Sequence, residues 1–300
     1  MEGGVGMKIH PECITCLLGK EVGRIPDQAP NAERLAYTRD LLELFLTEDV
    51  TAPVYNKKIA DRHRAFWKVD DRPMYEAAKK EHNALVAGLA PDMEAHIKKA
   101  ADPLELAIKI ARAGNYIDMA VLDTIDPEKL KELLEKSLDE ELDPRVYAEL
   151  AADLAGARSL VLLTDNCGEV VLDRLMLAEL KKLYPDLAVT IIVKSQTAAN
   201  DVTVADARAL GLDQDFQVLG NGSDVPGTSL DYLDGAAREA LYGADVILAK
   251  GQGNFETLTG CGLNIYYLFL CKCGHFTQMF GVPQFHSLFV RERDVAGLVN

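Results

Sequence analysis

Hydrophobic positions in the first half of the chain recur with the period of a helix. Residues 1–155 contain no convincing alternating or β-branched run, so the pattern predicts helices throughout this part. Proline suits the first position of a helix, and Asp102, Asp126 and Asp143 stand before three such prolines as expected N-caps. The expected helices cover residues 13–24, 32–45, 53–64, 75–90, 103–115, 127–137 and 144–155.

The pattern changes near residue 158, where short apolar runs begin to alternate with amphipathic segments. Strands are expected at 160–164, 189–194, 216–219, 246–250, 265–271 and 287–290, and helices at 170–183, 204–210 and 230–241. Strands that alternate with helices indicate a mainly parallel sheet covered on both faces. We therefore expect an α/β fold, with a three-layer αβα sandwich over residues 156–300 and a helical cap subdomain over residues 1–155, joined as one integrated unit.

Polar residues stand at the point where four of these strands end. Asp165 and Asn166 follow the first strand, and Asp201 comes shortly after the second. The third strand leads into residues 220–224, and the fourth ends at Lys250, before residues 251–256. Ligands bind at the carboxyl ends of the strands in open α/β sheets. If the strands are parallel and adjacent, all four clusters meet at one edge.

This set of side chains suits a hard divalent cation. Mg²⁺ and Mn²⁺ prefer oxygen ligands, which the carboxylates of Asp165 and Asp201 and the amide of Asn166 can supply. Glycine-flanked loops at 220–222 and 251–253 can turn backbone N–H groups towards an anion, and Lys250 can add a positive charge. Each cluster alone is typical of a turn or a helix cap. Four in succession, without a familiar nucleotide-binding motif, favour metal-assisted chemistry.

Composition and charge narrow the class of protein. The 300 residues are 48% hydrophobic, as expected of a packed globular chain. A formal net charge of −15 argues against a nonspecific nucleic-acid binder, which would show a basic face. We find no apolar run of membrane-spanning length and no signal-peptide core, so a cytoplasmic protein without a membrane partner is expected. The six cysteines are not spaced like a secreted disulfide scaffold and are expected to be thiols or ligands.

Six longer stretches are distinctive. They read HPECITC, ADPLELAIKIARAGNYID, TDNCGEVVLDRL, NDVTVADA, NGSDVPGTSLD and KGQGNFETL. Together they span nearly the whole chain and resemble the damage-control phosphatases, a metal-dependent family formerly catalogued as a domain of unknown function. The opening Cys13-x-x-Cys16 is similar to the archaeal and bacterial branch of that family.

The resemblance implies a helical subdomain joined to an αβα domain, with a metal held at Asp165, Asn166 and Asp201. It also implies hydrolysis of phosphate esters of small metabolites, including sugar phosphates and damaged metabolites, with Mg²⁺, Mn²⁺, Co²⁺ or Ni²⁺. Lys250 matches a position expected to contact phosphate. Asn115 matches another active-site position, which Asp118 would support; by itself Asn115 is also typical of a helix C-cap.

The resulting hypothesis is metal-assisted hydrolysis of a phosphomonoester, with a small phosphorylated metabolite as the partner. The cation would bind one phosphoryl oxygen, and Lys250 with residues of the glycine loops would hold the others. The expected loop residues are Gly222, Ser223, Gly253 and Asn254. A metal-oriented water and Asp165 itself both fit as the nucleophile. The sequence does not distinguish the substrate, the native metal or the oligomeric state.

The cysteines suggest a second, softer metal site. Cys13 and Cys16 are two ligands short of a closed zinc site, and Cys273 offers a partner near the other end of the chain, with Cys271 and His275 beside it. A buried thiol cluster explains the same residues equally well. Cys167 is expected to pack beside the main site.

Two other functions fit the same pattern less well. A carboxyl methyltransferase that uses S-adenosylmethionine would place its cofactor on a similar sheet, but the clusters here lack a glycine-rich nucleoside loop after the first strand. A non-catalytic protein could bind a phosphorylated metabolite through an inert metal site.

Overall fold

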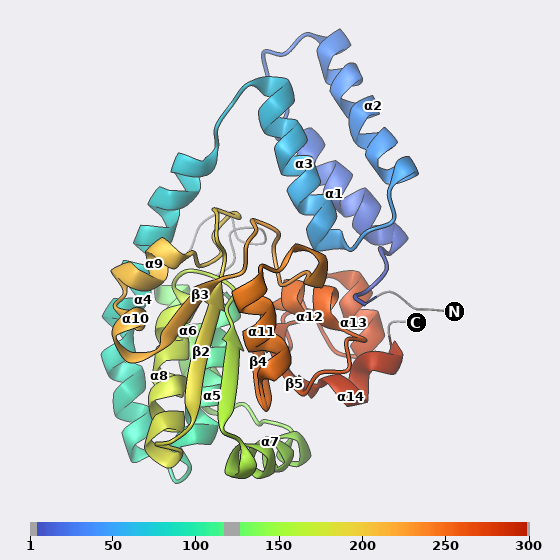
Figure 1. Ribbon diagram of the computed structural model, residues 1–300. Coiled ribbons are helices and arrows are strands. Elements are labelled where there is room, and N and C mark those ends of the chain that lie inside the picture. The colour runs from blue at the N-terminus through green and yellow to red at the C-terminus, as the bar shows by residue number, and fades with distance from the viewer. Residues whose placement is uncertain (1–4, 117–126, 299–300) are drawn as a thin grey trace.

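The computed structural model describes residues 5–116 and 127–298 and has a six-stranded sheet at its centre (Figure 1). The strands lie in the order β3-β2-β1-β4-β5-β6. Neighbours from β3 to β5 run parallel, and β6 pairs antiparallel with β5. The bounds are β1 (Ser159–Leu163), β2 (Ala188–Val193), β3 (Gln217–Gly220), β4 (Val246–Lys250), β5 (Ile265–Leu270) and β6 (Ser287–Arg291).

Helices cover both faces of this sheet, which confirms the expected three-layer α/β architecture. Alternate residues of a strand point to opposite faces. On β1, Leu160 and Leu162 belong to one buried cluster, and Val161 and Leu163 belong to another. The first face carries α4 (Arg72–Lys99), α5 (Pro103–Ala113), α6 (Pro127–Leu138), α7 (Pro144–Gly156) and α8 (Glu169–Leu183). The second face carries α11 (Gly235–Gly243), α12 (Gln252–Leu258), α13 (Gly274–Phe280) and α14 (Glu292–Val295).

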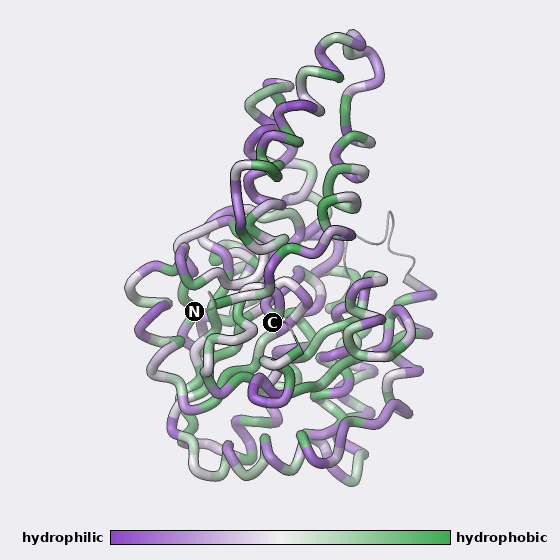
Figure 2. The backbone as a smooth tube through the Cα atoms, turned by 90° about the vertical axis from the view of Figure 1, so that its right-hand side faces the viewer, coloured by the Kyte–Doolittle hydropathy of each residue, from purple (hydrophilic) through white to green (hydrophobic). Residues whose placement is uncertain are grey.

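The first three helices form a projection with a small core of its own. They are α1 (Pro11–Gly23), α2 (Asn31–Thr47) and α3 (Ala52–Trp67), and Figure 1 shows them in blue, standing away from the sheet. Tyr37, Leu41 and Tyr55 are buried in this separate core. Figure 2 shows alternating hydrophobic and hydrophilic segments along the same projection.

The helical segment therefore divides differently from the expected boundary at residue 155. Only α1 to α3 share the separate core, whereas α4 to α7 contribute to the core on the first face of the sheet. Apolar faces explain this division: Leu104, Ile108 and Ala111 of α5 are all buried in that core.

Two expected helices differ from those observed by more than a few residues at an end. A single helix, α4, runs past Pro91 to Lys99, although the sequence predicted an end at residue 90. Val86, Met93 and Ile97 continue one buried face across the proline, and this packing outweighs the one lost backbone bond. The helix expected at 230–241 is divided into η2 (Leu230–Tyr232) and α11, because Asp234 accepts a hydrogen bond from the N–H of Ala237 and caps a new helix start.

The expected N-caps Asp102 and Asp143 are confirmed, since their side chains accept backbone N–H groups of the first turns of α5 and α7. Asp126 and Asp118 lie outside the described residues. Among the residues that are described, no helix combines the length and apolarity needed to cross a membrane. The remaining short elements are η1 (Gly114–Tyr116), α9 (Val204–Ala209), α10 (Leu212–Asp215) and η3 (Ala296–Leu298).

Candidate active site

Two loops meet at the carboxyl edge of the sheet, beside the point where the strand order reverses. Asn166, after β1, forms an isolated antiparallel bridge with Asp201, after β2. The N–H of Val202 donates to the carbonyl of Asp165 at 2.9 Å, and the N–H of Cys167 donates to the carbonyl of Asn200 at 2.9 Å. This backbone pairing brings the loops of Asp165, Asn166 and Asp201 together, at the position where doubly wound sheets bind ligands.

A large cavity opens onto these three residues. Its volume is about 780 Å³, and one part of its wall comes from the sheet edge, including Asp165, Asn166 and Asp201. The opposite part comes from α1 and α3, including Cys13, Lys20 and Asn56. The cavity therefore lies between the helical projection and the ends of the strands, and it has the size of a small-molecule site.

Asp165 is held by two side-chain amides. Oδ2 of Asp165 accepts from Nδ2 of Asn115 at 2.7 Å and from Nδ2 of Asn166 at 2.7 Å. Asn115 is fully buried, and its Nδ2 also donates to Glu169 at 3.0 Å while its Oδ1 accepts the N–H of Leu270 at 3.2 Å. Asn115 thus ties η1 to β5 and to the loop after β1, and it contacts the cavity-lining Asp165 without lining the cavity itself.

The backbone of Gly251 lies against the carboxylate of Asp165. Gly251 has a φ of +80°, and a Cβ at this position would stand 2.0 Å from Oδ2 of Asp165. Only a residue without a side chain leaves room for the carboxylate here. The sequence predicted that the loop of Gly251 binds phosphate. In the structure, the absence of a side chain at Gly251 leaves the space that the Asp165 carboxylate occupies.

The donor set at this edge fits a hard divalent cation. Asp165 and Asp201 are two largely buried carboxylates, and Nζ of Lys194 is 3.5 Å from Oδ2 of Asp201. The amide nitrogen of Asn166 points to Asp165, so its Oδ1 is the atom available as a ligand. No three His, Cys, Asp or Glu side chains converge into a metal site within residues 5–116 and 127–298. A cation at Asp165 and Asp201 therefore depends on the amide oxygen and water for its other ligands.

Lys250 does not point towards the cavity, contrary to the expectation that it contacts phosphate. Its side chain is fully buried, and Nζ donates to the carbonyl of Ala111, to Glu169 and to Asp173 at 2.7, 2.7 and 2.6 Å. These acceptors use all three donors of the ammonium group. Burial favours the neutral amine, but the carboxylates of Asp173 and Glu169 raise the pKa of Lys250 above its usual value. Lys250 thus holds the carboxylate of Glu169 in place, and this carboxylate in turn accepts a hydrogen bond from Asn115.

The expected phosphate-binding loops are also arranged differently. The N–H of Gly222 donates to Oγ of Ser195 at 2.7 Å, and the N–H of Ser223 donates to Oδ1 of Asn221 at 3.0 Å. Ser195, after β2, and Asn221 accept these two N–H groups, and neither Gly222 nor Ser223 lines the cavity, contrary to the expectation. Gly253 does line the cavity. Asn254 is fully buried beside it, where Nδ2 donates to the carbonyls of Thr164 and Lys250 at 3.2 and 2.6 Å.

The cysteines of the expected second metal site share one wall of the cavity without forming a metal cluster. Cys13, Cys16 and Cys273 all line the cavity, but no group of three metal-binding side chains forms there or elsewhere in the described chain. They are free thiols, and burial raises the pKa of Cys13 to about 11, so this thiol stays protonated. His275 stacks on His10 with ring centroids 4.0 Å apart. Cys167 is fully buried in the core, which agrees with the expected packing role.

The sequence pattern placed Glu256 in the polar segment after β4 but indicated no role for it. This residue lies one helical turn after Gln252 on α12, and both line the cavity. Nε2 of Gln252 donates to Oε1 of Glu256 at 2.8 Å. Burial raises the pKa of Glu256 from 4.5 to about 7, against smaller opposing effects of Gln252 and Lys272. Gln252 and Glu256 are four residues apart within KGQGNFETL, and this spacing would have predicted that their side chains meet on one face of a helix.

The raised pKa of Glu256 predicts a pH-dependent loss of stability. The native state binds this proton more tightly than the unfolded state, so the stabilising contribution is complete below pH 4.5 and is lost as the pH rises through about 7. The full change is at most about 3 kcal/mol. The quantity to measure is the unfolding free energy of Glu256→Gln minus that of the unchanged protein, from urea titrations with EDTA. We expect this difference to be larger at pH 8 than at pH 5. Glu239→Gln, at an exposed position, should show no such difference. An equal difference for Glu256→Gln at both pH values would contradict the prediction.

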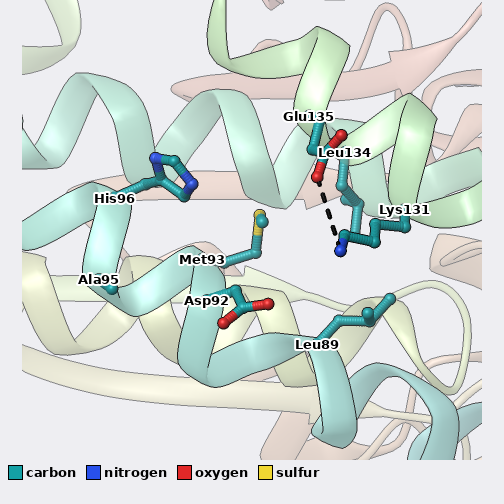
Figure 3. Close-up of a pocket in the computed structure, with 8 residues that line it drawn as sticks. All are labelled: Leu89, Asp92, Met93, Ala95, His96, Lys131, Leu134 and Glu135. Carbon is teal, nitrogen blue, oxygen red and sulfur yellow. Dashed lines mark ion pairs between the residues drawn. The ribbon is translucent and has the colours of Figure 1, made fainter.

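A smaller pocket lies away from these residues, between α4 and α6 (Figure 3). Its volume is about 140 Å³, and Figure 3 shows Lys131 paired with Glu135 at its rim. None of the expected site residues lines it. The large cavity is therefore the candidate active site.

The comparison with protein families agrees with this geometry. The model of the damage-control phosphatase ARMT1-like domain matches residues 9–288, which is nearly the whole chain. The chain belongs to this family. Its relatives in the family include proteins named as phosphatases, so the family supports hydrolase activity and a role in metabolite repair.

Two archaeal relatives of this damage-control phosphatase family illustrate the likeness. Damage-control phosphatase PH1575 of Pyrococcus horikoshii is 30% identical over 284 residues, which are 93% of this chain and 96% of the relative. A damage-control phosphatase of Archaeoglobus fulgidus is 28% identical and covers 92% of this chain and 96% of its own length. The crystal structure of PH1575, described as a DUF89 family protein, superposes with a TM-score of 0.79 at 28% identity, covering 95% of this chain and 99% of the other.

Proposed function

We propose that this chain is a metal-dependent phosphatase that hydrolyses phosphomonoesters of small metabolites, such as sugar phosphates or damaged phosphometabolites. The observation that carries the proposal is the bridge between Asn166 and Asp201, because it gathers two carboxylates and an amide on the wall of a metabolite-sized cavity. The expected cofactor is Mg²⁺, Mn²⁺, Co²⁺ or Ni²⁺. Membership of a family with named phosphatases supports the same reaction class.

One set of residues would bind the cation, and a second set would bind the ester. Asp165, Asn166 and Asp201 would bind the cation, which supplies a Lewis acid for the phosphoryl oxygens. Asn115 keeps the Asp165 carboxylate in one orientation through its 2.7 Å hydrogen bond. Such preorganised ligands avoid a reorganisation cost during the reaction.

Other residues on the cavity wall suit an anionic substrate. Lys20 and Lys272 line the cavity, and they place positive charge there in a chain whose net charge is −15. Since Lys250 lies below the cavity, these two lysines replace it as the proposed phosphate contacts. The backbone of Gly253 stays on the wall as a further proposed contact.

The test is a metal-dependence assay on purified protein. Protein stripped with EDTA is supplied in turn with Mg²⁺, Mn²⁺, Co²⁺ or Ni²⁺, and phosphate release is measured from p-nitrophenyl phosphate and a panel of sugar phosphates, nucleotides and phosphopantetheine-type esters. We expect no release without metal and restored release with at least one cation. Release that EDTA does not affect would contradict the metal dependence. Binding without turnover across the whole panel, or methyl transfer from S-adenosylmethionine, would contradict the phosphatase itself.

A further inference from the structure

One face of α4 carries three polar residues that the proposed reaction does not use. Glu76, Lys79 and Asn83 are three and four residues apart, so they lie on the same side of the helix. The side chain of Lys79 is fully buried although lysine is rarely found inside proteins. We call Glu76, Lys79 and Asn83 the α4 polar face.

The α4 polar face contacts the loop of Asp165 and Asn166. Oδ1 of Asn83 accepts the backbone N–H of Gly168 at 2.6 Å. Gly168 has a φ of +85° and ends the turn that begins at Asp165. Asn83 thus holds the point at which the chain turns from the expected ligands into α8.

The same face reaches the loop of Asp201 by two routes, one of them through Asp206 of α9. Nζ of Lys79 pairs with Oδ2 of Asp206 at 2.7 Å, and this oxygen also accepts the N–H and Oγ1–H of Thr203 at 2.9 and 2.6 Å. Thr203 is two residues from Asp201.

Glu76 makes the second contact with this loop. Its Oε1 accepts from Oγ1 of Thr197 at 2.6 Å and pairs with Nζ of Lys79 at 3.0 Å. The loop is therefore held on both sides of Asp201, at Thr197 and at Thr203.

Lys79 keeps its charge in this environment. Burial favours the neutral amine, but Asp206 and Glu76 raise the pKa of Lys79 above its usual value. A buried ion pair of this kind adds little net stability, because desolvation offsets the attraction between the charges. Its contribution is geometric: it fixes where the ends of the paired side chains lie. Groups that hydrogen-bond metal ligands directly typically change metal affinity 10- to 100-fold when they are removed. The α4 polar face contacts the loops beside the expected ligands, so we expect an effect at the lower end of this range.

We propose that the α4 polar face positions both ligand loops, so that Glu76, Lys79 and Asn83 set the affinity of the Asp165–Asp201 site for its divalent cation. This inference rests on the proposed function. These three are positioning residues, since none of them lines the cavity. They act on cation binding rather than on the chemical step.

The experiment measures Mn²⁺ binding to EDTA-stripped full-length protein by isothermal titration calorimetry. Lys79→Met and Asn83→Leu are each expected to weaken Mn²⁺ binding about 10-fold. Lys79→Arg keeps the positive charge and should recover most of the affinity. Lys80→Met, at the exposed neighbouring position on the same helix, should bind like the unchanged protein.

A kinetic measurement separates positioning from a general loss of structure. In the two weakened variants, the Mn²⁺ concentration for half-maximal phosphate release should rise about 10-fold, while kcat at saturating Mn²⁺ stays within about threefold. Melting of the metal-free proteins reports whether they fold. If Lys79→Met does not fold because Asp206 is left buried without its partner, Glu76→Ala removes only a half-buried side chain and is expected to weaken Mn²⁺ binding by the same route.

The results distinguish this inference from the proposed function. Unchanged Mn²⁺ affinity in folded Lys79→Met, Asn83→Leu or Glu76→Ala, with clear binding by the unchanged protein, would overturn the role of the α4 polar face alone. No Mn²⁺ binding by the unchanged protein, or binding that Asp165→Asn leaves intact, would instead overturn the proposed metal site.

Discussion

Replacing Asp165 with asparagine is expected to lower metal-dependent phosphate release about a thousandfold, equivalent to about 4 kcal/mol of transition-state stabilisation. The change removes one of two carboxylates from the proposed cation site but keeps the size of the side chain. Asparagine can still accept the hydrogen bonds that Asn115 and Asn166 now donate to Oδ2. Asp201→Asn should have a comparable effect, because it removes the other carboxylate.

Stability measurements show whether Asp165→Asn loses phosphate release because a cation ligand is missing or because the protein unfolds. Asparagine keeps the size of the side chain and an acceptor for Asn115 and Asn166, so metal-free Asp165→Asn is expected to melt close to the temperature of the unchanged protein. Asp92→Asn is the matched control, since Asp92 is exposed beside the small pocket of Figure 3. Near-normal turnover in purified Asp165→Asn, with the control unaffected, would rule out Asp165 as a cation ligand.

Gly251→Ala is expected to lower phosphate release about a hundredfold, because small displacements of reacting groups can have effects of this size. The new Cβ would stand 2.0 Å from Oδ2 of Asp165, so the carboxylate must move away from Asn115 and Asn166. Gly251 also combines a φ of +80° with a ψ of 157°, a conformation that residues with side chains rarely adopt. A lower melting temperature should accompany the lost activity.

The control for Gly251→Ala separates backbone strain from the contact with Asp165. Gly260 has a φ of +87°, yet a Cβ at this position would meet no atom within 4 Å. Gly260→Ala should therefore lose stability through its backbone, by about 1 kcal/mol or somewhat more, and keep its kcat. Equal kcat values for the two alanine variants would show that the Cβ at residue 251 does not disturb Asp165.

The fold could be predicted from the sequence because its strands are apolar runs followed by polar turns. The same pattern located Asp165, Asn166 and Asp201 at strand ends, and the pairing of parallel strands placed them at one edge. The expected end of α4 was wrong because Pro91 is a local signal, whereas the buried face that continues past it depends on the tertiary core.

The direction of Lys250 could not be predicted in the same way. All five residues of β4 are buried, so the strand shows no alternation that would reveal which face its last side chain joins. The partners of Lys250 come from α5 and α8, and their approach depends on how helices pack on the sheet. The α4 polar face was missed for a similar reason, since Lys79 and Asp206 are distant in sequence.

The two sides of the large cavity come from parts of the chain with different cores. The side with Asp165 and Asp201 belongs to the sheet, whereas Thr15, Leu17 and Asn56 on the opposite side belong to the projection, which has its own core around Tyr37 and Leu41. In the proposed phosphatase, substitutions of these three residues are expected to reshape the space around the organic part of the ester, because they lie outside the loops of Asp165 and Asp201. In the proposed phosphatase, changes on the projection side are therefore expected to alter which ester is accepted, while the affinity of the proposed site for its cation stays the same.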